Sequence, residues 1–447
     1  MVIRLNAREV ALKIINTIDT NAAYANIALA KELGAQQLSD QDRRFVTELV
    51  YGTVKAGATL DWILEHYLSR SLKKVAPVIR NILRLGVYQL FFLSKVPASA
   101  ACNQAVELTK KYGHAGTVKF VNAVLRNAAR NPEKVVYPAM QDDPVRSLAL
   151  RYFHPDWIVK RWIERLGPEE AEALCRINNA TPPLSLRTNT LKISRDKLLA
   201  VLAEEGVECE ASQWTPEGIL CYGFPALGSL QSLQQGLFQI QDESSMLVAH
   251  VVAPQAGEFI LDVCSAPGGK STHMAALMSN QGRIVAADVH EHKLALVEEN
   301  AARLGIGMIE TKVLDATKIG DLYAGQADRV LVDAPCSGLG VLRRKPDARW
   351  RKSPVMLREL PELQLQILHS AACCVKAAGI LVYSTCTTEP EENTQVVDAF
   401  LRNHPEFVLE KTGDYLPQPH GDQETVQLWP QRDQVDGFFI ARMKRVR

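Results

Sequence analysis

The last half of the chain, about residues 237–447, alternates apolar strand-like runs with helix-like stretches. Its clearest unit joins the apolar run 259–264 to the glycine-rich loop 265–270, and a helix-like stretch, 271–277, follows. A strand, a glycine turn and a helix amino terminus together bind anions or nucleotides, because glycine lets the backbone approach a ligand and the helix dipole favours negative charge. The pattern predicts an α/β domain with a Rossmann-like parallel sheet.

Two ligands fit this loop. Gly269-Lys270-Ser271 matches the end of the P-loop signature, and the run 330–333 resembles the magnesium-holding strand of an ATPase. However, Cys264 stands where the signature requires its first glycine, and without that glycine the backbone loses the freedom to wrap a triphosphate. A different nucleotide-like ligand is therefore favoured for this loop. ATP, bound by an RNA-dependent ATPase, stays as the alternative.

Acids at successive strand ends favour the other ligand. Asp288 closes the run 283–288, twenty residues after Gly268, which is the spacing at which a carboxylate accepts hydrogen bonds from ribose hydroxyls. Asp315 and Asp333 close the next two runs. A single strand-end aspartate is usually a turn or helix cap, but three in consecutive units indicate a nucleoside ligand without a pyrophosphate. S-adenosylmethionine fits this description.

Two cysteines also close apolar runs: Cys336 ends the run 329–336 and Cys386 ends the run 380–386. Ligands of open α/β sheets gather beyond the carboxyl ends of the strands, so we expect both thiols to face one cleft. A buried cysteine can also be a small apolar filler. The turns that follow both cysteines, and Asp333 just upstream of the first, favour a functional role.

A methyl donor beside two thiols suggests cytosine chemistry. Carbon 5 of cytosine is a poor nucleophile until a thiolate adds to carbon 6 and turns the ring into an enamine. A second ionisable group near the leaving thiolate would speed its release. We expect Asp333 to hydrogen-bond the N3/N4 edge of the base.

The amino-terminal part is the basic part of the chain. The whole chain has a net charge of +1, of which residues 1–144 carry +7. Apolar residues recur there at helical spacing, which predicts a helical bundle. Its cations form either a solvated face or a phosphate-binding face. They are Arg80, Arg84, Lys110, Lys111, Lys119, Arg126 and Arg130.

Two further segments have candidate RNA contacts. The stretch 184–189 alternates like a strand in a small α+β module, and its Arg187 and Asn189 are either solvated or touch a polynucleotide. The segment 343–352 interleaves Trp350 with six cations, which suits phosphate contact and base stacking unless the segment is only a solvated loop.

Several classes of protein and site are not indicated. No run approaches the roughly 18 apolar residues of a membrane span, and the opening residues lack a signal-peptide core, so we expect a cytoplasmic protein. Nine cysteines without a C-x-x-C pair predict neither a disulfide framework nor a zinc knuckle. His290 and His292 lack a third ligand nearby in sequence, so we expect no metal site.

Motifs along the chain resemble known families. The stretches 42–52, 84–90 and 119–126 resemble the NusB family of all-helical RNA-binding domains, a likeness that spans most of residues 5–130. Asp333-Ala-Pro-Cys336-Ser-Gly, Tyr383-Ser-Thr-Cys386 and Pro390-Glu-Glu-Asn393 resemble the RNA 5-methylcytosine methyltransferases. Together the motifs cover nearly the whole chain and point to the bacterial small-subunit ribosomal RNA methyltransferase B (Sun/Fmu) family.

The resemblance implies a class I S-adenosylmethionine-dependent methyltransferase domain at 237–447, preceded by an all-helical NusB-like domain at 1–140 and an α+β module at 145–236. It implies methylation of carbon 5 of a cytidine in 16S ribosomal RNA, naked or in a partly assembled small subunit. We expect the chain to be a monomer. A catalytically idle assembly factor related to NusB is the third alternative, against which both cysteines argue.

The resemblance also assigns residue roles. Cys386 is the nucleophile and Cys336 assists product release, whereas DNA cytosine methyltransferases use the cysteine of the Pro-Cys motif as nucleophile. Lys376–Gly379 and Thr387-Thr388 depart from the family pattern without touching a proposed reacting atom. The implied cofactor residues are Cys264, Ser265, Ala266, Pro267, Gly268, Gly269, Lys270, Asp288, Asp315 and Asp333.

Overall fold

The computed structural model describes residues 6–21, 23–36, 38–69, 71–223, 227–418 and 423–447. The chain forms two compact units. Unit 1 comprises Met1–Ala180 together with Leu342–Lys352, and unit 2 comprises Thr181–Val341 and Ser353–Arg447. The predicted domain ranges 1–140, 145–236 and 237–447 stay a prediction. Residues 1–5, 22, 37, 70, 224–226 and 419–422 of these ranges lie outside the described residues.

Unit 1 is all-helical, as the apolar spacing predicts. The amphipathic helices up to Arg130 bury one face each in a common core that includes Val10, Leu49, Ile82 and Leu125. The helices are α1 (Ala7–Asn21), α2 (Ala25–Ala35), α3 (Asp40–Lys55), α4 (Gly57–Glu65), α5 (Pro77–Phe92), α6 (Ala98–Tyr112), α7 (Ala115–Arg130), α8 (Pro144–Tyr152), α9 (Asp156–Leu166) and α10 (Pro168–Ile177).

Unit 2 opens with the predicted small α+β module. An antiparallel sheet in the order β2-β3-β1-β4 packs Leu186 and Ile219 against Leu198 and Leu202 of a helix. The elements are β1 (Leu184–Thr188), α11 (Arg195–Glu204), β2 (Glu208–Ala211), β3 (Gly218–Gly223), α12 (Gln231–Gln234) and β4 (Phe238–Ile240).

The rest of unit 2 is a Rossmann-like sheet in the order β10-β12-β9-β8-β5-β6-β7, with β11 beside β12. Strands β5 to β9 pair in parallel, and β10, β11 and β12 are antiparallel. The elements are α13 (Glu243–Val252), β5 (Phe259–Asp262), α14 (Gly269–Leu277), β6 (Arg283–Asp288), α15 (Glu291–Leu304), β7 (Ile309–Val313), α16 (Gly320–Tyr323), β8 (Ala327–Asp333), α17 (Met356–Cys374), β9 (Val375–Thr385), α18 (Thr394–Asn403), β10 (Phe407–Leu409), β11 (Thr425–Leu428), α19 (Pro430–Asp433) and β12 (Phe438–Arg445).

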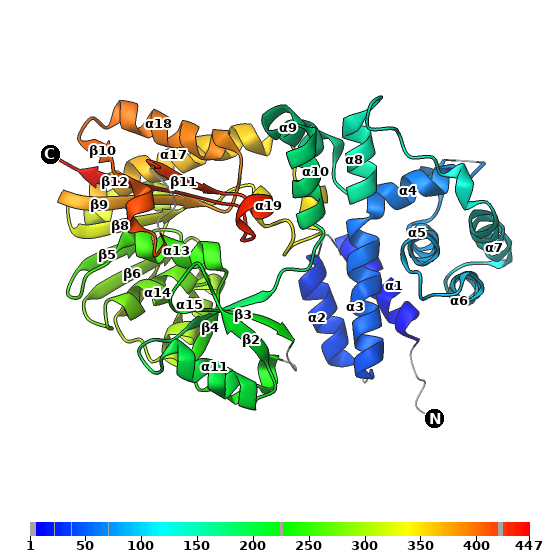
Figure 1. The fold of residues 1–447 in the computed structure, drawn as a ribbon, viewed down its shortest axis with the longest axis horizontal. Coiled ribbons are helices and arrows are strands. Elements are labelled where there is room, and N and C mark those ends of the chain that lie inside the picture. Colours follow the sequence, from blue (N-terminus) through cyan, green and yellow to red (C-terminus); the bar gives the residue numbers. More distant parts are fainter. Residues whose placement is uncertain (1–5, 22, 37, 70, 224–226, 419–422) are drawn as a thin grey trace. The chain divides into compact units, whose positions relative to one another are not determined.

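Helices cover both faces of this sheet (Figure 1). Successive strand residues point to opposite faces, so Leu261 and Val330 pack with α17 and α18, whereas Ile260 and Leu331 pack with α13 and α14. Two covered faces explain why the strands are apolar throughout rather than alternating. Among the described residues, no helix has the length and apolarity to cross a membrane.

Candidate active site

The carboxyl ends of the parallel strands form one edge of the sheet, and the candidate residues lie there. The strand order turns at β5, which has β6 on one side and β8 on the other, and ligands of such sheets bind at this turning point. Asp333 ends β8 and pairs with Ser384 of β9. The strands end earlier than the sequence suggests, because β8 stops three residues before Cys336 and β9 stops just before Cys386.

A pocket of about 380 Å³ opens at this edge, which is within the usual range for small-molecule sites. Its lining combines three carboxylates with apolar side chains, a composition that suits a nucleoside. Five predicted cofactor residues line it: Cys264, Ala266, Asp288, Asp315 and Asp333. The other lining residues are Val263, Val289, His290, Lys293, Ala316, Thr317, Pro335, Leu363 and Ile367.

The remaining residues of the predicted cofactor loop shape its backbone. The amide and hydroxyl of Ser265 both donate to the carbonyl of Ala287, at 2.9 and 3.1 Å. Gly268 has a φ of 93°, and a Cβ there would lie 2.9 Å from Cγ1 of Val297. Both the backbone angle and the crowding require glycine, so the loop turns tightly against α15 after Pro267 and starts α14 at Gly269.

Two of the strand-end acids also serve as turn caps. One oxygen of Asp288 accepts from the amide of His290 at 2.9 Å. One oxygen of Asp315 accepts from the amide and hydroxyl of Thr317, and these bonds lower the pKa of Asp315. The capping role that is usual for such residues is therefore present in both, and both carboxylates still line the pocket.

Polar residues at the two ends of the predicted cofactor loop make hydrogen bonds that the sequence did not predict. Asp262 is 1% exposed and accepts from the hydroxyl of Ser271 at 2.6 Å. Burial raises the pKa of Asp262 to about 7. Lys270 donates to Asp333 at 2.6 Å. The lysine and serine that would hold phosphate and magnesium in an ATPase are therefore both engaged elsewhere, which counts against the P-loop alternative.

Arg187 and Asn189 are neither solvated nor RNA contacts, so both interpretations of them are wrong. Arg187 is 2% exposed and donates to the carbonyl of Gly269 and, at 3.0 Å, to the hydroxyl of Thr272. Asn189 is also buried and donates to the carbonyls of Gly236 and Leu304. Both side chains tie the α+β module to the Rossmann-like part of unit 2, and Arg187 braces the cofactor loop.

The two thiols meet at the same edge, with 3.4 Å between the sulfurs of Cys336 and Cys386. The hydrogen bond to Cys386, together with burial, raises the pKa of Cys336 well above its ordinary value. Either sulfur can donate in this contact. Burial lowers the pKa of Lys270, but the negative charges of Asp333 and Cys386 outweigh it and keep the ammonium charged.

Asp333 has a fixed orientation in this group. One of its oxygens accepts from Lys270 and the other accepts from the hydroxyl of Ser384 at 2.8 Å. The Asp333 side chain keeps 27% of its surface exposed, so the carboxylate can still meet a ligand.

A second network holds the two cysteine loops together, and Glu392 is its centre. Glu392 is 0% exposed and accepts from the amide of Ser337 at 2.8 Å, from the hydroxyl of Ser337 and from the amide of Gln364 at 3.0 Å. Burial raises the pKa of Glu392. Asn393 accepts from Thr385 at 2.6 Å. The only signal for these residues in the sequence is the motif 390–393, which belongs to the resemblance.

One group of side chains within the described residues could hold a metal ion: Glu217, His250 and His273. Nε2 of each histidine lies 2.9 Å from the same oxygen of Glu217. Burial raises the pKa of Glu217, but hydrogen bonds from the two histidines hold it below its usual range. His273 follows the cofactor loop on α14 and does not line the pocket. The expectation of no metal site, made from His290 and His292, stays a prediction.

The basic segment 343–352 has a structural role in unit 1. Arg349 is 0% exposed and donates to the carbonyls of Phe153 and Asn178, at 2.9 and 3.0 Å. These carbonyls lie at the carboxyl ends of α8 and α10, where helices leave carbonyls unpaired and the dipole is negative. The predicted RNA contact is therefore wrong for Arg349, which caps two helices.

Neighbours of Arg349 cap two more helices. The indole N–H of Trp350 donates at 3.1 Å to the carbonyl of Lys55, the last residue of α3. A carboxylate oxygen of Asp347 accepts at 3.3 Å from the amide of Ala25, the first residue of α2. A carboxylate at a helix amino terminus and donors at carboxyl termini are the arrangement that helix dipoles favour.

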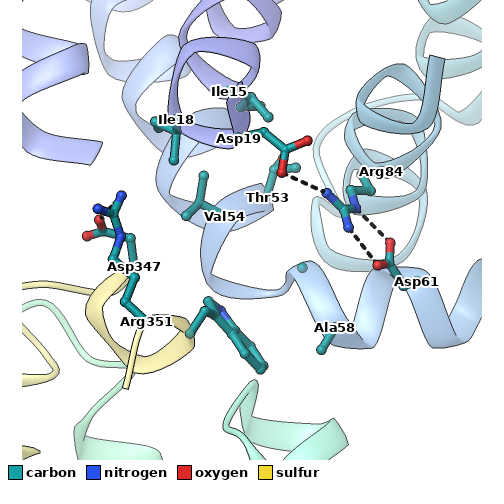
Figure 2. A pocket seen from close by; sticks show the side chains of 12 residues that line it. Ile15, Ile18, Asp19, Thr53, Val54, Ala58, Asp61, Arg84, Asp347 and Arg351 are labelled. Carbon is teal, nitrogen blue, oxygen red and sulfur yellow. Dashed lines mark hydrogen bonds and ion pairs between the residues drawn. The ribbon is translucent and has the colours of Figure 1, made fainter. Parts of the chain in front are cut away.

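Some cations of the helical bundle are also paired. Figure 2 shows Arg84 between Asp61 and Asp19, beside a pocket of about 450 Å³ in unit 1. Arg80 pairs with Asp19 at 3.0 Å. A phosphate-binding role is thus disfavoured for both arginines. The exposed cations of the predicted set lie at the end of α6 and along α7: Lys110, Lys111, Lys119, Arg126 and Arg130.

Known protein families match the amino-terminal helices, the α+β module and the Rossmann-like part of the chain. Residues 249–444 match the family described as 16S rRNA methyltransferase RsmB/F, residues 5–130 match the NusB family, and residues 154–223 match a ferredoxin-like domain of RsmF/B-like methyltransferases. The chain is 42% identical to the probable ribosomal RNA small subunit methyltransferase B of Bacillus subtilis, with 99% of each chain covered.

A second curated relative and two solved structures are also similar to this chain. Ribosomal RNA small subunit methyltransferase B of Pseudomonas putida is 33% identical, with 99% of each chain covered. The solved structure of PH0851 has a TM-score of 0.83 at 27% identity and covers 99% of this chain and 100% of its own. NSun6 from Pyrococcus horikoshii with SFG has a TM-score of 0.60 at 26% identity and covers 66% of this chain and 98% of its own.

Proposed function

The chain belongs to the 16S rRNA methyltransferase RsmB/F family, and from this premise we propose that it methylates carbon 5 of a cytidine in small-subunit ribosomal RNA. The methyl donor is S-adenosylmethionine, and the reaction passes through a covalent bond between Cys386 and the base. The single observation that carries this proposal is the pair of thiols 3.4 Å apart beside a nucleoside-sized pocket.

The two thiols have different tasks. The Lys270 ammonium favours a thiolate at Cys386, and the raised pKa of the neighbouring Cys336 favours a thiol there. As a thiolate, Cys386 adds to carbon 6 of the cytosine and makes carbon 5 nucleophilic. Cys336, which holds its proton, is placed to assist when the carbon 5 proton leaves and the Cys386–base bond breaks.

Asp333 positions the base. Its carboxylate, oriented by Lys270 and Ser384, is suited to bind the N3/N4 edge of a cytosine and to stabilise the adduct. The positive charge of Lys270 compensates the negative charges of the Asp333 carboxylate and the Cys386 thiolate.

The pocket suits the methyl donor by its chemistry. The carboxylate of Asp288 is placed for ribose hydroxyls, and Asp315 and the backbone of 264–270 complete the polar lining. Apolar contacts from Val289 and Ile367 suit a purine ring. S-adenosylmethionine, when bound, supplies an electrophilic methyl group on a sulfonium.

The support for ribosomal RNA as substrate comes from relatives and from charge. The curated relatives carry small-subunit ribosomal RNA in their names, and the amino-terminal part matches NusB. Exposed cations on α7 offer a phosphate-binding face. We propose 16S RNA, naked or in a partly assembled subunit, as the substrate of a cytoplasmic monomer.

The test separates the two thiols. Cys386→Ser should abolish turnover and leave no adduct, whereas Cys336→Ser should methylate once and stay attached to the RNA. Denaturing gels after incubation with substrate RNA and methyl donor should show a shifted band for the Cys336 variant. Cys209→Ser, outside the site, is the matched control and should behave as the parent.

Two results would overturn the proposal. A shifted band with Cys386→Ser alone would reverse the roles of the two thiols. Normal methylation by Cys386→Ser, with no shifted band from either variant, would reject covalent cytosine chemistry.

A further inference from the structure

We propose that Cys336 and Cys386 are a site of reversible oxidation by hydroperoxides, and that a disulfide between them switches methyl transfer off. Formation of the disulfide rests on the geometry of the two thiols alone. The loss of methyl transfer rests in addition on the proposed function.

The two sulfurs are already close to bonding distance. They lie 3.4 Å apart, and a disulfide needs about 2.05 Å, so they must approach by roughly 1.4 Å. The backbone holds the two loops together, because the amide of Gly340 donates to the carbonyl of Cys386 at 3.0 Å. A Cβ at Gly338 would lie 4.0 Å from the sulfur of Cys386. The backbone bond and the contact between the sulfurs therefore keep the two thiols adjacent.

The chemistry balances with a hydroperoxide as the oxidant. The Cys386 thiolate attacks hydrogen peroxide, the O–O bond breaks, and a sulfenic acid and hydroxide form. The Cys336 thiol then attacks the sulfenic sulfur, and the S–O bond breaks as the S–S bond forms. Overall, two thiols and one hydrogen peroxide give one disulfide and two water molecules.

The chain offers a second pair of cysteines for comparison. Cys209 and Cys221 are directly opposite one another on β2 and β3. Cys221 is 1% exposed, and burial raises its pKa to about 12. Cys209, Cys336 and Cys386 are all half-buried, but burial also raises the pKa of Cys209, whereas Lys270 favours the Cys386 thiolate. Since thiolate and access control reactivity, hydrogen peroxide should oxidise the active-site pair first.

The experiment treats the full-length protein with increasing hydrogen peroxide and maps its peptides by mass spectrometry. We expect a peptide in which Cys336 is linked to Cys386 and which has lost the mass of two hydrogens. Methyl transfer should fall in proportion to the linked fraction, and dithiothreitol should restore both. Cys209→Ser should show the same linked peptide and the same loss.

Cys336→Ser tests the order of events. Without the resolving thiol, Cys386 should advance to the sulfinic acid, which dithiothreitol does not reverse. Sulfinic acid on Cys386 of the parent protein without a linked peptide would overturn the proposal, as would earlier linkage of Cys209 to Cys221. If the linked peptide forms in a protein that methylates no cytosine, the proposed function fails and the oxidation site stands.

Discussion

The segment 343–352 and helix α7 are both rich in cations, yet the structure uses them in opposite ways. In the segment, Arg349 is 0% exposed and its guanidinium caps two helix ends. On α7, Lys119, Arg126 and Arg130 are exposed on a helix whose apolar residues face the core. The sequence makes the segment the stronger RNA candidate, because it adds a tryptophan to a denser run of charge.

The role of each cation depends on whether the fold places an unpaired hydrogen-bond acceptor within its reach. Carbonyls at the ends of α8 and α10 lie unpaired unless a donor reaches them, and Arg349 supplies that donor from nearly two hundred residues away. Arg130 makes no comparable hydrogen bond within the described part of unit 1, and its side chain is exposed. Four variants test whether buried and exposed charges differ in this way.

Arg349→Met should have the largest effect on stability. It leaves the carbonyls of Phe153 and Asn178 without their donor, and each unsatisfied group costs about 1–3 kcal/mol, so we expect a loss of about 3–5 kcal/mol. Calorimetric unfolding of the full-length protein would measure it. Arg130→Met, the exposed counterpart on α7, should change stability by less than about 0.5 kcal/mol. Equal effects of the two substitutions would remove the distinction between the regions.

Asp262→Asn examines a buried charge of unit 2. Burial raises the pKa of Asp262 to about 7 in the folded protein, against about 3.9 in an unfolded chain. The folded state therefore binds the proton more tightly, and wild-type stability falls as the pH rises from about 4 to 7. The asparagine variant lacks this fall and should gain about 4 kcal/mol relative to the parent between pH 4 and 8. Denaturant titrations at several pH values that gave parallel curves would contradict the assignment.

Asp288→Ala concerns a charge that faces the pocket. The substitution should weaken binding of S-adenosylmethionine by about 1.5–3 kcal/mol, the scale of a hydrogen bond to a charged group, without unfolding the protein. Isothermal titration calorimetry would measure the change, with the exposed Asp321→Ala as control. An unchanged affinity, or tight binding of ATP by the parent protein, would reject the pocket assignment.

Replacing Lys119, Arg126 and Arg130 together by glutamine should have the smallest effect on free energy, a roughly tenfold loss of RNA affinity at fixed salt. The slope of log affinity against log salt should fall by up to about 2, since each phosphate contact to a single strand contributes about 0.7. Arg80→Gln, which removes a cation already paired with Asp19, should leave the slope unchanged. Identical slopes for the triple variant and the parent would exclude α7 as the phosphate-binding face.

These substitutions are a cleaner test than removal of the predicted domain 1–140. Unit 1 extends to Ala180 and includes Leu342–Lys352. A cut at 140 would divide one compact unit and remove the partners of Asp347 and Trp350 in α2 and α3. Loss of RNA binding after such a cut would not distinguish a missing surface from a disrupted fold.

Features that depend on neighbours along the chain could be predicted from the sequence. The glycine loop before Lys270, the acids Asp288 and Asp333 at strand ends and the helical spacing of unit 1 all follow from local periodicity and backbone preference. Because parallel strands bring their carboxyl ends to one edge, strand logic also put Cys336 and Cys386 near each other, and the structure gives the 3.4 Å between them.

The hydrogen-bond partners of the buried polar side chains could not be predicted from the sequence. Arg187, Arg349 and Glu392 occupy local sequence contexts that suit a solvated surface, and all three are buried on backbone or side-chain groups remote in the sequence. A buried polar group needs a hydrogen-bond partner, and the fold determines where an unpaired donor or acceptor lies. The local sequence pattern does not predict the position of that partner, because the position depends on how distant helices and strands pack.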